Sequence, residues 1–294
     1  MIGHTLCVYC DRRILCIPGS TSPSAWCFTC RAARLNGSTS KTIMAKKGRR
    51  HDDRCPHTYL IRILISMSES RKTLMEDGTM IKLQGLSSKQ VQKISAQIAD
   101  AFYDYRYNED DIGLLKYISS RDAMFIYINA IVQAAYKSRV LYTTSERQEG
   151  YLMLSGEGAG GRIGFIDGIK MIAAEKKALG GFGCMKKFIN ACFCDGGTIE
   201  TRMRKEKRKF LRIEMLVVRE EYQGQGYMRQ LMDYACEIAE KHHVPVILDT
   251  DDKDKAARYT HLGMKLDRVR NCGEHFHMYD LIRECDNPSG GTIL

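Results

Sequence analysis

The sequence lacks long hydrophobic runs. Among its 294 residues the run "YLIRILIS" at 59–66 stands out, but a membrane-spanning helix needs about 20 apolar residues. The N-terminus also lacks the basic region, apolar region and small-residue cleavage site that make up a secretory signal. We therefore expect a cytoplasmic protein with no membrane partner and with mostly reduced thiols.

Net charge is nearly absent from most of the chain. Residues 1–66 contain 11 Lys/Arg and 3 Asp/Glu, which accounts for +8 of the formal charge of +10. The other residues carry 34 basic and 32 acidic side chains. A nearly neutral main body offers no electrostatic reason to expect nucleic acid as a partner.

The chain changes character near residue 70. Residues 1–70 are basic and rich in cysteine, and the stretch 35–54 shows neither helical nor strand periodicity. We interpret 1–70 as an extension that is either disordered or a mis-assigned start, since Met67, Met75 or Met80 offers a later one. A folded domain is expected over 80–284, followed by a flexible tail at 285–294.

Helical and strand patterns alternate in that domain without internal repeats. Helices are predicted from Ser87 or Ser88, over 121–138, within 165–207, up to about 241, and over 253–262. The strand-like runs are "MIKLQGL" near 80, 139–144, 150–155, 210–218, 244–250 and 274–283. This order predicts an α/β or α+β fold with a mixed sheet. Residues 156–209 form a long helical insertion, a natural place for an acceptor pocket.

Two glycine loops compete for a cofactor. Gly156, Gly158 and Gly161 spell G-x-G-x-x-G after a strand, the pattern of nicotinamide dinucleotide enzymes. No strand ending in an acidic residue follows about 20 residues later, where such enzymes contact the ribose. A connection between a strand and a helix explains this loop more simply, and an oxidoreductase stays the alternative function.

The second loop, within "EYQGQGYMRQLM" at 221–232, lies between a strand and a well-defined amphipathic helix. Gly224 and Gly226 lack a Cβ, so a bulky anion can approach the backbone there. The unpaired N–H groups of the first helical turn then point at that anion. A plain tight turn that uses glycine for positive φ is the competing interpretation.

The stretch "VVREEYQGQGYMRQLM" resembles the acetyl-CoA-binding motif of the GNAT superfamily of N-acetyltransferases, Gln/Arg-x-x-Gly-x-Gly/Ala at a strand–helix junction. Gln223 and Gly226 match it, and Met228 departs at its last position. Downstream, "ARYTHLGMKL" resembles the family's Tyr-x-x-x-Gly-Phe signature through Tyr259 and Gly263. The resemblance implies a GNAT-like acyl-CoA-binding fold, in which helices flank a mixed central sheet.

The resemblance also implies acetyl-CoA as co-substrate and direct transfer of its acetyl group to a primary amine of a small molecule. No covalent intermediate and no catalytic metal are needed. The pantetheine arm is expected along the strand edge, and the diphosphate on the backbone of the turn. These cofactor-binding residues are Leu216, Val217, Val218, Gln223, Gly224, Gln225, Gly226, Tyr227 and Met228.

Two residues are candidates for catalysis. Glu214 interrupts the apolar run "RIEMLVV", where the period of a strand places it on one face with Arg212 and Leu216. It is expected to be the general base, unless it is a surface carboxylate paired with Arg212. The resemblance implies that Tyr259 protonates the departing thiolate; packing in the core is the alternative.

The run "DTDDKDK" at 249–255 concentrates aspartates just after a strand. An acidic mouth for a cationic amine is one interpretation. A solvated loop in which one aspartate caps the next helix is the simpler one.

The cysteines suggest a second kind of site. Cys7, Cys10, Cys27 and Cys30 have the spacing of a zinc ribbon, which makes a nucleic-acid-binding protein acting through residues 1–50 a further alternative. Little strand pattern separates the two pairs, so no metal is expected. Cys184 and the pair in "ACFC" at 191–194 fit helix interiors better than a metal site. His275 and His277 share a strand face near Cys272, an arrangement that is usually structural.

Overall fold

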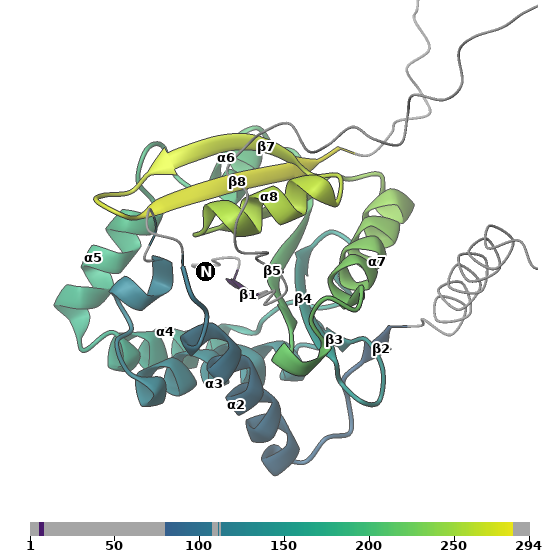
Figure 1. Ribbon diagram of the computed structural model, residues 1–294, viewed down its shortest axis with the longest axis horizontal. Coiled ribbons are helices and arrows are strands. Elements are labelled where there is room, and N and C mark those ends of the chain that lie inside the picture. Colours follow the sequence, from purple (N-terminus) through teal and green to yellow (C-terminus); the bar gives the residue numbers. More distant parts are fainter. Residues whose placement is uncertain (1–5, 9–79, 108–110, 112, 285–294) are drawn as a thin grey trace, which may run out of the picture. The chain divides into compact units, whose positions relative to one another are not determined.

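The computed structural model describes residues 6–8, 80–107, 111 and 113–284. A mixed eight-stranded sheet has the order β2-β3-β4-β5-β6-β8-β7, and β1 pairs with β5 outside this path. Its strands are β1 Leu6–Val8, β2 Ile81–Lys82, β3 Leu141–Thr143, β4 Gly150–Gly156, β5 Leu211–Val218, β6 Val246–Thr250, β7 Lys265–Asn271 and β8 His277–Arg283. The mixed sheet flanked by helices confirms the predicted fold class (Figure 1).

Four of the described α-helices start at a polar N-cap. Ser87 and Gln90 form a capping box, and Ser120, Thr198 and Asp252 each accept a hydrogen bond from the first turn of a helix. The helices are α2 Ser88–Tyr103, η1 Gly113–Lys116, α3 Arg121–Lys137, α4 Phe165–Ala178, α5 Phe182–Cys192, α6 Ile199–Lys205, η2 Glu220–Tyr222, α7 Tyr227–His242 and α8 Lys253–His261. The predicted helical insertion is therefore three helices, α4 to α6.

One strand was not anticipated. The sequence predicts a single strand over 274–283, whereas β7 and β8 form an antiparallel hairpin. The β7 sequence "KLDRVRN" gives no apolar alternation because β7 lies at the edge of the sheet and is largely exposed. Charged edge strands of this kind avoid pairing with other molecules.

Glu214 forms a β-bulge in β5. The pairing with β4 shifts there, so Ile213 and Met215 face consecutive residues of β4 and Glu214 has no partner in the ladder. Since paired residues share a face, the bulge reverses the alternation along β5. The expectation that Leu216 shares the face of Arg212 is therefore wrong, because Leu216 lies on the opposite face.

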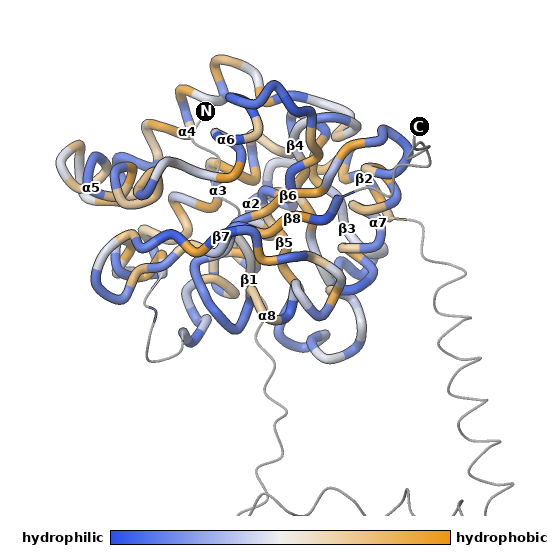
Figure 2. The backbone as a smooth tube through the Cα atoms, turned by 90° about the horizontal axis from the view of Figure 1, so that it is seen from above, coloured by the Kyte–Doolittle hydropathy of each residue, from blue (hydrophilic) through white to orange (hydrophobic). Residues whose placement is uncertain are grey.

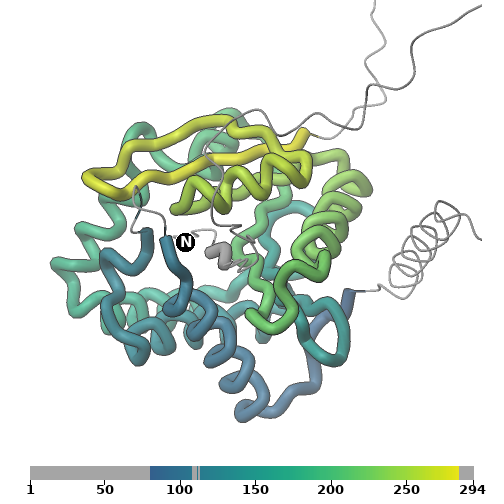
Figure 3. Tube along the Cα trace, in the orientation of Figure 1, coloured from purple at the N-terminus to yellow at the C-terminus, as the bar shows by residue number. Residues whose placement is uncertain are grey.

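The two faces of the sheet are covered by different helices. On the face of Arg212, α6 contributes Glu200 and Arg202, which form ion pairs with strand residues. On the other face, α7 packs mainly against β4 and β5, and α8 lies against β6 and β8 (Figure 1). The segment around η1, early in the chain, packs against the late β7–β8 hairpin (Figure 3), where the rings of Tyr117 and Phe276 are 5.5 Å apart.

The loop 155–161 packs closely against its own chain. A Cβ at Gly156 would overlap the Phe210 carbonyl, and one at Gly161 would overlap the Ser138 carbonyl. Close backbone approach therefore explains these glycines without a dinucleotide.

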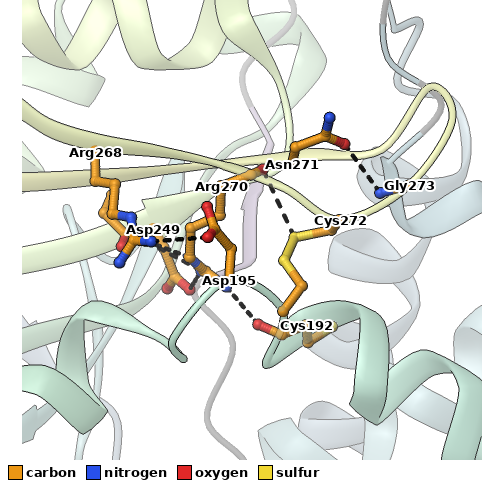
Figure 4. The surroundings of a disulfide bond; sticks show 10 residues. Cys192, Asp195, Asp249, Arg268, Arg270, Asn271, Cys272 and Gly273 are labelled. Atoms are coloured by element: carbon orange, nitrogen blue, oxygen red, sulfur yellow. Dashed lines mark hydrogen bonds and ion pairs between the residues drawn. A yellow bond between two sulfur atoms is a disulfide. The ribbon is translucent and has the colours of Figure 1, made fainter.

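A disulfide joins Cys194 to Cys272, 78 residues later (Figure 4). The expectation of reduced thiols is wrong for this pair, because the sequence does not reveal that the loop after α5 meets the end of β7. Next to the disulfide, Asp195 is paired with Arg268 at 3.0 Å. The tip of the β7–β8 hairpin is thus tied to the helical insertion. No helix of the described residues combines the length and the apolarity that crossing a membrane would require.

Candidate active site

The parallel strands β5 and β6 diverge. They pair only at Leu211 with Val246 and at Arg212 with Ile247, after which the ladder stops. Both strands continue beyond these pairs, β5 to Val218 and β6 to Thr250. The divergence opens a splay between the two strands.

The freed edge of β5 is occupied by the chain itself. β1 runs parallel to β5 there, with Leu6 opposite Met215, Cys7 opposite Leu216 and Val8 opposite Val217. The expectation of an exposed edge is therefore wrong. The place assigned to the pantetheine arm is thus filled by an extended stretch of main chain. The amides of a pantetheine arm would make hydrogen bonds to β5 of the same kind as β1 does.

The glycine turn follows β5 at the open end of the splay. Gly224 and Gly226 have φ angles of +73° and +93°, which favour glycine. Gly226 is the N-cap of α7, no side chain caps this helix, and a Cβ at Gly226 would meet nothing within 4 Å. Arg229 lies exposed in the first turn, which contains no acidic residue. This helix start has the backbone donors and the charge for an anion.

The side chains around the turn leave its backbone accessible. Gln223 donates from Nε2 to the Val218 carbonyl at 3.1 Å, which holds the turn against the end of β5. Gln225 donates to the Glu221 carbonyl at 3.0 Å. Met228, which departs from the family pattern, is 6% exposed and packs in the core. Its side chain therefore does not block the turn.

Glu214 lies in a polar cluster on the α6 face. It accepts a hydrogen bond from Ser155 of β4, and the Arg212 Nε atom lies 3.2 Å from its carboxylate. Burial raises the pKa of Glu214 above its ordinary value, although Arg212 and Ser155 act in the opposite direction. A partly desolvated carboxylate with raised proton affinity has the property that a general base needs.

Arg212 connects Glu214 to a buried ion-pair network. Arg212 also contacts Glu200 at 2.6 Å and Asp249 at 2.7 Å, and Asp249 lies 3.0 Å from Arg270 (Figure 4). Arg212, Asp249 and Arg270 are completely buried. Asp249 therefore balances buried cations, which removes it from the predicted acidic mouth.

Asp251 and Asp252 of this run also have internal partners, whereas Asp254 is exposed. Asp251 is 3.1 Å from the buried Lys255 ammonium and accepts a 2.6 Å hydrogen bond from Tyr107. Asp252 caps α8, as the simpler interpretation predicted. The acidic-mouth interpretation is therefore wrong for Asp249, Asp251 and Asp252, because these carboxylates pair with buried cations of the chain or cap a helix.

Tyr259 lies on α8 and is fully buried. α8 covers the face opposite to α6, so Tyr259 and Glu214 approach the sheet from different faces. The structure does not bring them together on one face.

A cavity of about 750 Å³ opens beside the β7–β8 hairpin. Its lining includes Lys253, Val269, Asn271, Glu274, His277 and Tyr279. Since Tyr279 pairs with Thr250 at the end of β6, the cavity lies at the end of the sheet toward which β5 diverges. It does not lie in the insertion 156–209, where the sequence suggested an acceptor pocket.

The cavity contains a pair that the sequence did not reveal. The Nδ1 atom of His277 lies 2.9 Å from Asp111 Oδ1, and Tyr279 donates to Asp111 Oδ2 at 3.2 Å. Asp111 is 1% exposed, whereas the His277 side chain is 31% exposed. A buried carboxylate that holds Nδ1–H leaves Nε2 of the ring available as a proton acceptor.

No cluster of potential metal ligands occurs among the described residues. Of the four zinc-ribbon cysteines, only Cys7 belongs to them, through the backbone of β1. Cys10, Cys27 and Cys30 lie outside the described residues, so the zinc-ribbon hypothesis stays a prediction.

Residues 172–264 match the acetyltransferase (GNAT) family. This region belongs to that family. It runs from α4 to the end of the Tyr259 motif and includes β5, the glycine turn, α7, β6 and α8. The match confirms the resemblance and, with it, the expectation of an acyl-CoA-dependent N-acetyltransferase. No curated protein sequence matches the chain.

The solved structures that resemble this chain are distant in sequence. An N-acetyltransferase from Staphylococcus aureus Mu50 is 15% identical, with a TM-score of 0.40 over 70% of this chain and 100% of its own. Arylalkylamine N-acetyltransferase 2 from Aedes aegypti is 12% identical, with a TM-score of 0.39 over 70% and 98%. The polyamine N-acetyltransferase of Drosophila melanogaster is 11% identical, with a TM-score of 0.41 over 70% and 99%. None of them indicates the substrate of this chain.

Proposed function

We propose that this protein transfers an acetyl group from acetyl-CoA to a primary amine of a small molecule. The observation that carries the proposal is the divergence of β5 and β6 toward an uncapped helix start with an open glycine turn. Once β1 is displaced, the edge of β5 can pair with the amides of pantetheine. The helix start offers N–H groups to the diphosphate.

In the proposed reaction the amine nitrogen attacks the carbonyl carbon of the thioester, and the carbon–sulfur bond then breaks. An N–H group of β5 stabilises the oxyanion, a contribution of about 3 to 4 kcal/mol in acyl-transfer enzymes. The amine loses its proton to a base, and the CoA thiolate gains one from Tyr259. Glu214 is the candidate base on the α6 face.

The cavity at the β7–β8 hairpin supports a route for the amine. His277 is a second candidate base there, because Asp111 orients its ring and its side chain is accessible. A cavity of about 750 Å³ has the size of small-molecule sites, which supports a small amine as the acceptor. Glu274 lines this cavity with its side chain 89% exposed, so its carboxylate would attract a cationic amine.

Calorimetric titration of acetyl-CoA into the full chain tests the cofactor site. We expect micromolar binding that is lost in Gly226→Glu, because the new carboxylate repels the diphosphate. Gly226→Asn is the matched control, since asparagine tolerates positive φ and adds no charge. Thermal melting of the three proteins shows whether the fold is intact. Absence of binding to the unmodified chain, or equal binding to a folded Gly226→Glu variant, contradicts the proposal.

A further inference from the structure

The helices α4 and α5 present large apolar side chains to solvent. On α4, Phe165 is 83% exposed, Ile166 67%, Ile169 52% and Ile172 47%; on α5, Phe182 is 66% exposed. These five residues are called the α4–α5 surface below. Larger exposed apolar patches on proteins usually mark sites of interaction.

The exposed residues of α4 form one stripe. Phe165, Ile169 and Ile172 recur at helical spacing, and Ile166 lies beside them. Ala178, on the opposite side of the helix, and Glu175, next to the stripe, are buried, and α4 packs against α3. The helix is therefore held in place by one side while its apolar stripe faces outward. Figures 1 and 2 show α4 and α5 next to each other beyond α3.

The charges around this stripe have one sign. Between residues 162 and 193 every exposed ionic side chain is basic: Arg162, Lys170, Lys176, Lys177, Lys186 and Lys187. The same segment has two acidic residues, and neither is an exposed free charge. Asp167 is 3.1 Å from Lys137 with 22% of its side chain exposed, and Glu175 is buried.

The combination of apolar and cationic groups discriminates between possible occupants. A second copy of the chain would bring two sets of cations together, which is unfavourable. An anionic phospholipid surface satisfies both features. Phenylalanine and isoleucine enter the boundary between headgroups and acyl chains, while lysines remain at the anionic headgroups.

We propose that the α4–α5 surface binds peripherally to membranes that contain anionic phospholipids. Such binding does not require a membrane-spanning helix, so it agrees with the absence of one among the described helices. The sequence-based expectation of no membrane partner considered spanning segments only. The proposed surface lies outside the glycine turn, the splay and the cavity, and it does not depend on acetyl transfer.

Vesicle flotation of the full chain tests this proposal. Phosphatidylcholine vesicles with and without phosphatidylserine are compared, each at low and at raised salt. We expect flotation with phosphatidylserine vesicles only, and less of it at raised salt because headgroup charges are screened. Ile169→Glu is expected to reduce the bound fraction by about tenfold, because it places an anion in the apolar stripe. Leu266→Glu is the matched control: Leu266 is 48% exposed on β7, and this variant should float like the unmodified chain.

Charge reversal gives an independent second variant. Lys170→Glu combined with Lys177→Glu leaves the apolar stripe intact and is expected to abolish the preference for phosphatidylserine. Circular dichroism melting verifies that each variant is folded. The proposal is overturned if the unmodified chain does not float, or if the Ile169 variant floats equally well. It is also overturned if the unmodified chain is a dimer by light scattering and Ile169→Glu makes it a monomer.

Discussion

The imidazole of His277 lies 2.9 Å from the carboxylate of Asp111, which is 166 residues earlier in the chain. Asp111 precedes η1, and His277 starts β8 at the edge of the cavity. Asp111 also accepts from Tyr279 and from the backbone of Lys253 at 3.3 Å. Three parts of the chain therefore determine the orientation of one ring.

His277→Ala is expected to lower kcat by about 10²- to 10⁴-fold, the usual range for a general base. Added imidazole should restore part of the rate, because the small base can occupy the vacated space. His275→Ala is the control, since His275 lines the same cavity without contacting Asp111. A loss without rescue, alongside an equal loss in the control, would mean that His277 is structural.

Glu214→Gln should also lower kcat by about 10²- to 10⁴-fold if Glu214 takes the proton of the amine. A protonated carboxyl cannot accept a proton, so the rate of the unmodified enzyme should fall as the pH drops through the raised pKa of Glu214. This limb of the pH–rate profile should be absent from the variant. Glu157→Gln, at a carboxylate that is 42% exposed, is the control. An unchanged acid limb in Glu214→Gln would leave His277 as the base.

Tyr259→Phe should reduce kcat with little change in the affinity for acetyl-CoA, because it removes one buried hydroxyl. A leaving group of low pKa does not need protonation, so a thioester of an aromatic thiol should react at nearly equal rates with both enzymes. Stopped-flow measurements with the two thioesters make this comparison. If both substrates are slowed equally, Tyr259 serves core packing.

Deletion of residues 1–12 should strengthen the binding of acetyl-CoA. β1 occupies the edge of β5 that the pantetheine arm would use, so binding in the full chain requires its displacement. We expect the Kd for acetyl-CoA to fall roughly threefold to tenfold, because in the full chain β1 leaves the site free in only a fraction of the molecules. Cys7→Pro keeps the chain length and removes a backbone N–H of β1, so it should act in the same direction. Equal Kd values for all three proteins would show that β1 does not compete.

Glu175 makes stability depend on pH. Burial raises its pKa to about 7, above the value of an unfolded chain. The folded state therefore binds the proton of Glu175 more tightly than the unfolded chain does. The resulting stabilisation is complete below the pKa of Glu175 in the unfolded chain and is lost as the pH rises through its pKa in the folded state. Glu175→Gln should be more stable than the unmodified chain at about pH 8, with a smaller difference at about pH 5. Urea unfolding measures both, and Glu237→Gln, at an exposed position of α7, should show no such change. A difference independent of pH would contradict the assignment.

Local patterns predicted the features that depend on neighbouring residues. An N-cap at Ser87 or Ser88 and a cap by one aspartate of 249–255 were expected, and Ser87 and Asp252 take these roles. Positive φ at Gly224 and Gly226, the competing interpretation of the turn, is also observed. Side-chain periodicity likewise identified most helices and strands. The edge strand β7 was missed because its exposed faces carry charges.

The sequence by itself determined the order of the elements, the fold class and the glycine turn with its family motif. The tertiary structure alone decided which distant groups meet: His277 with Asp111, Cys194 with Cys272, and β1 with β5. It also decided that one bulge at Glu214 turns Leu216 away from Arg212, and that the apolar stripe of α4 faces solvent. Periodicity shows that a helix has an apolar side, but only the packing of the other elements shows whether that side is covered.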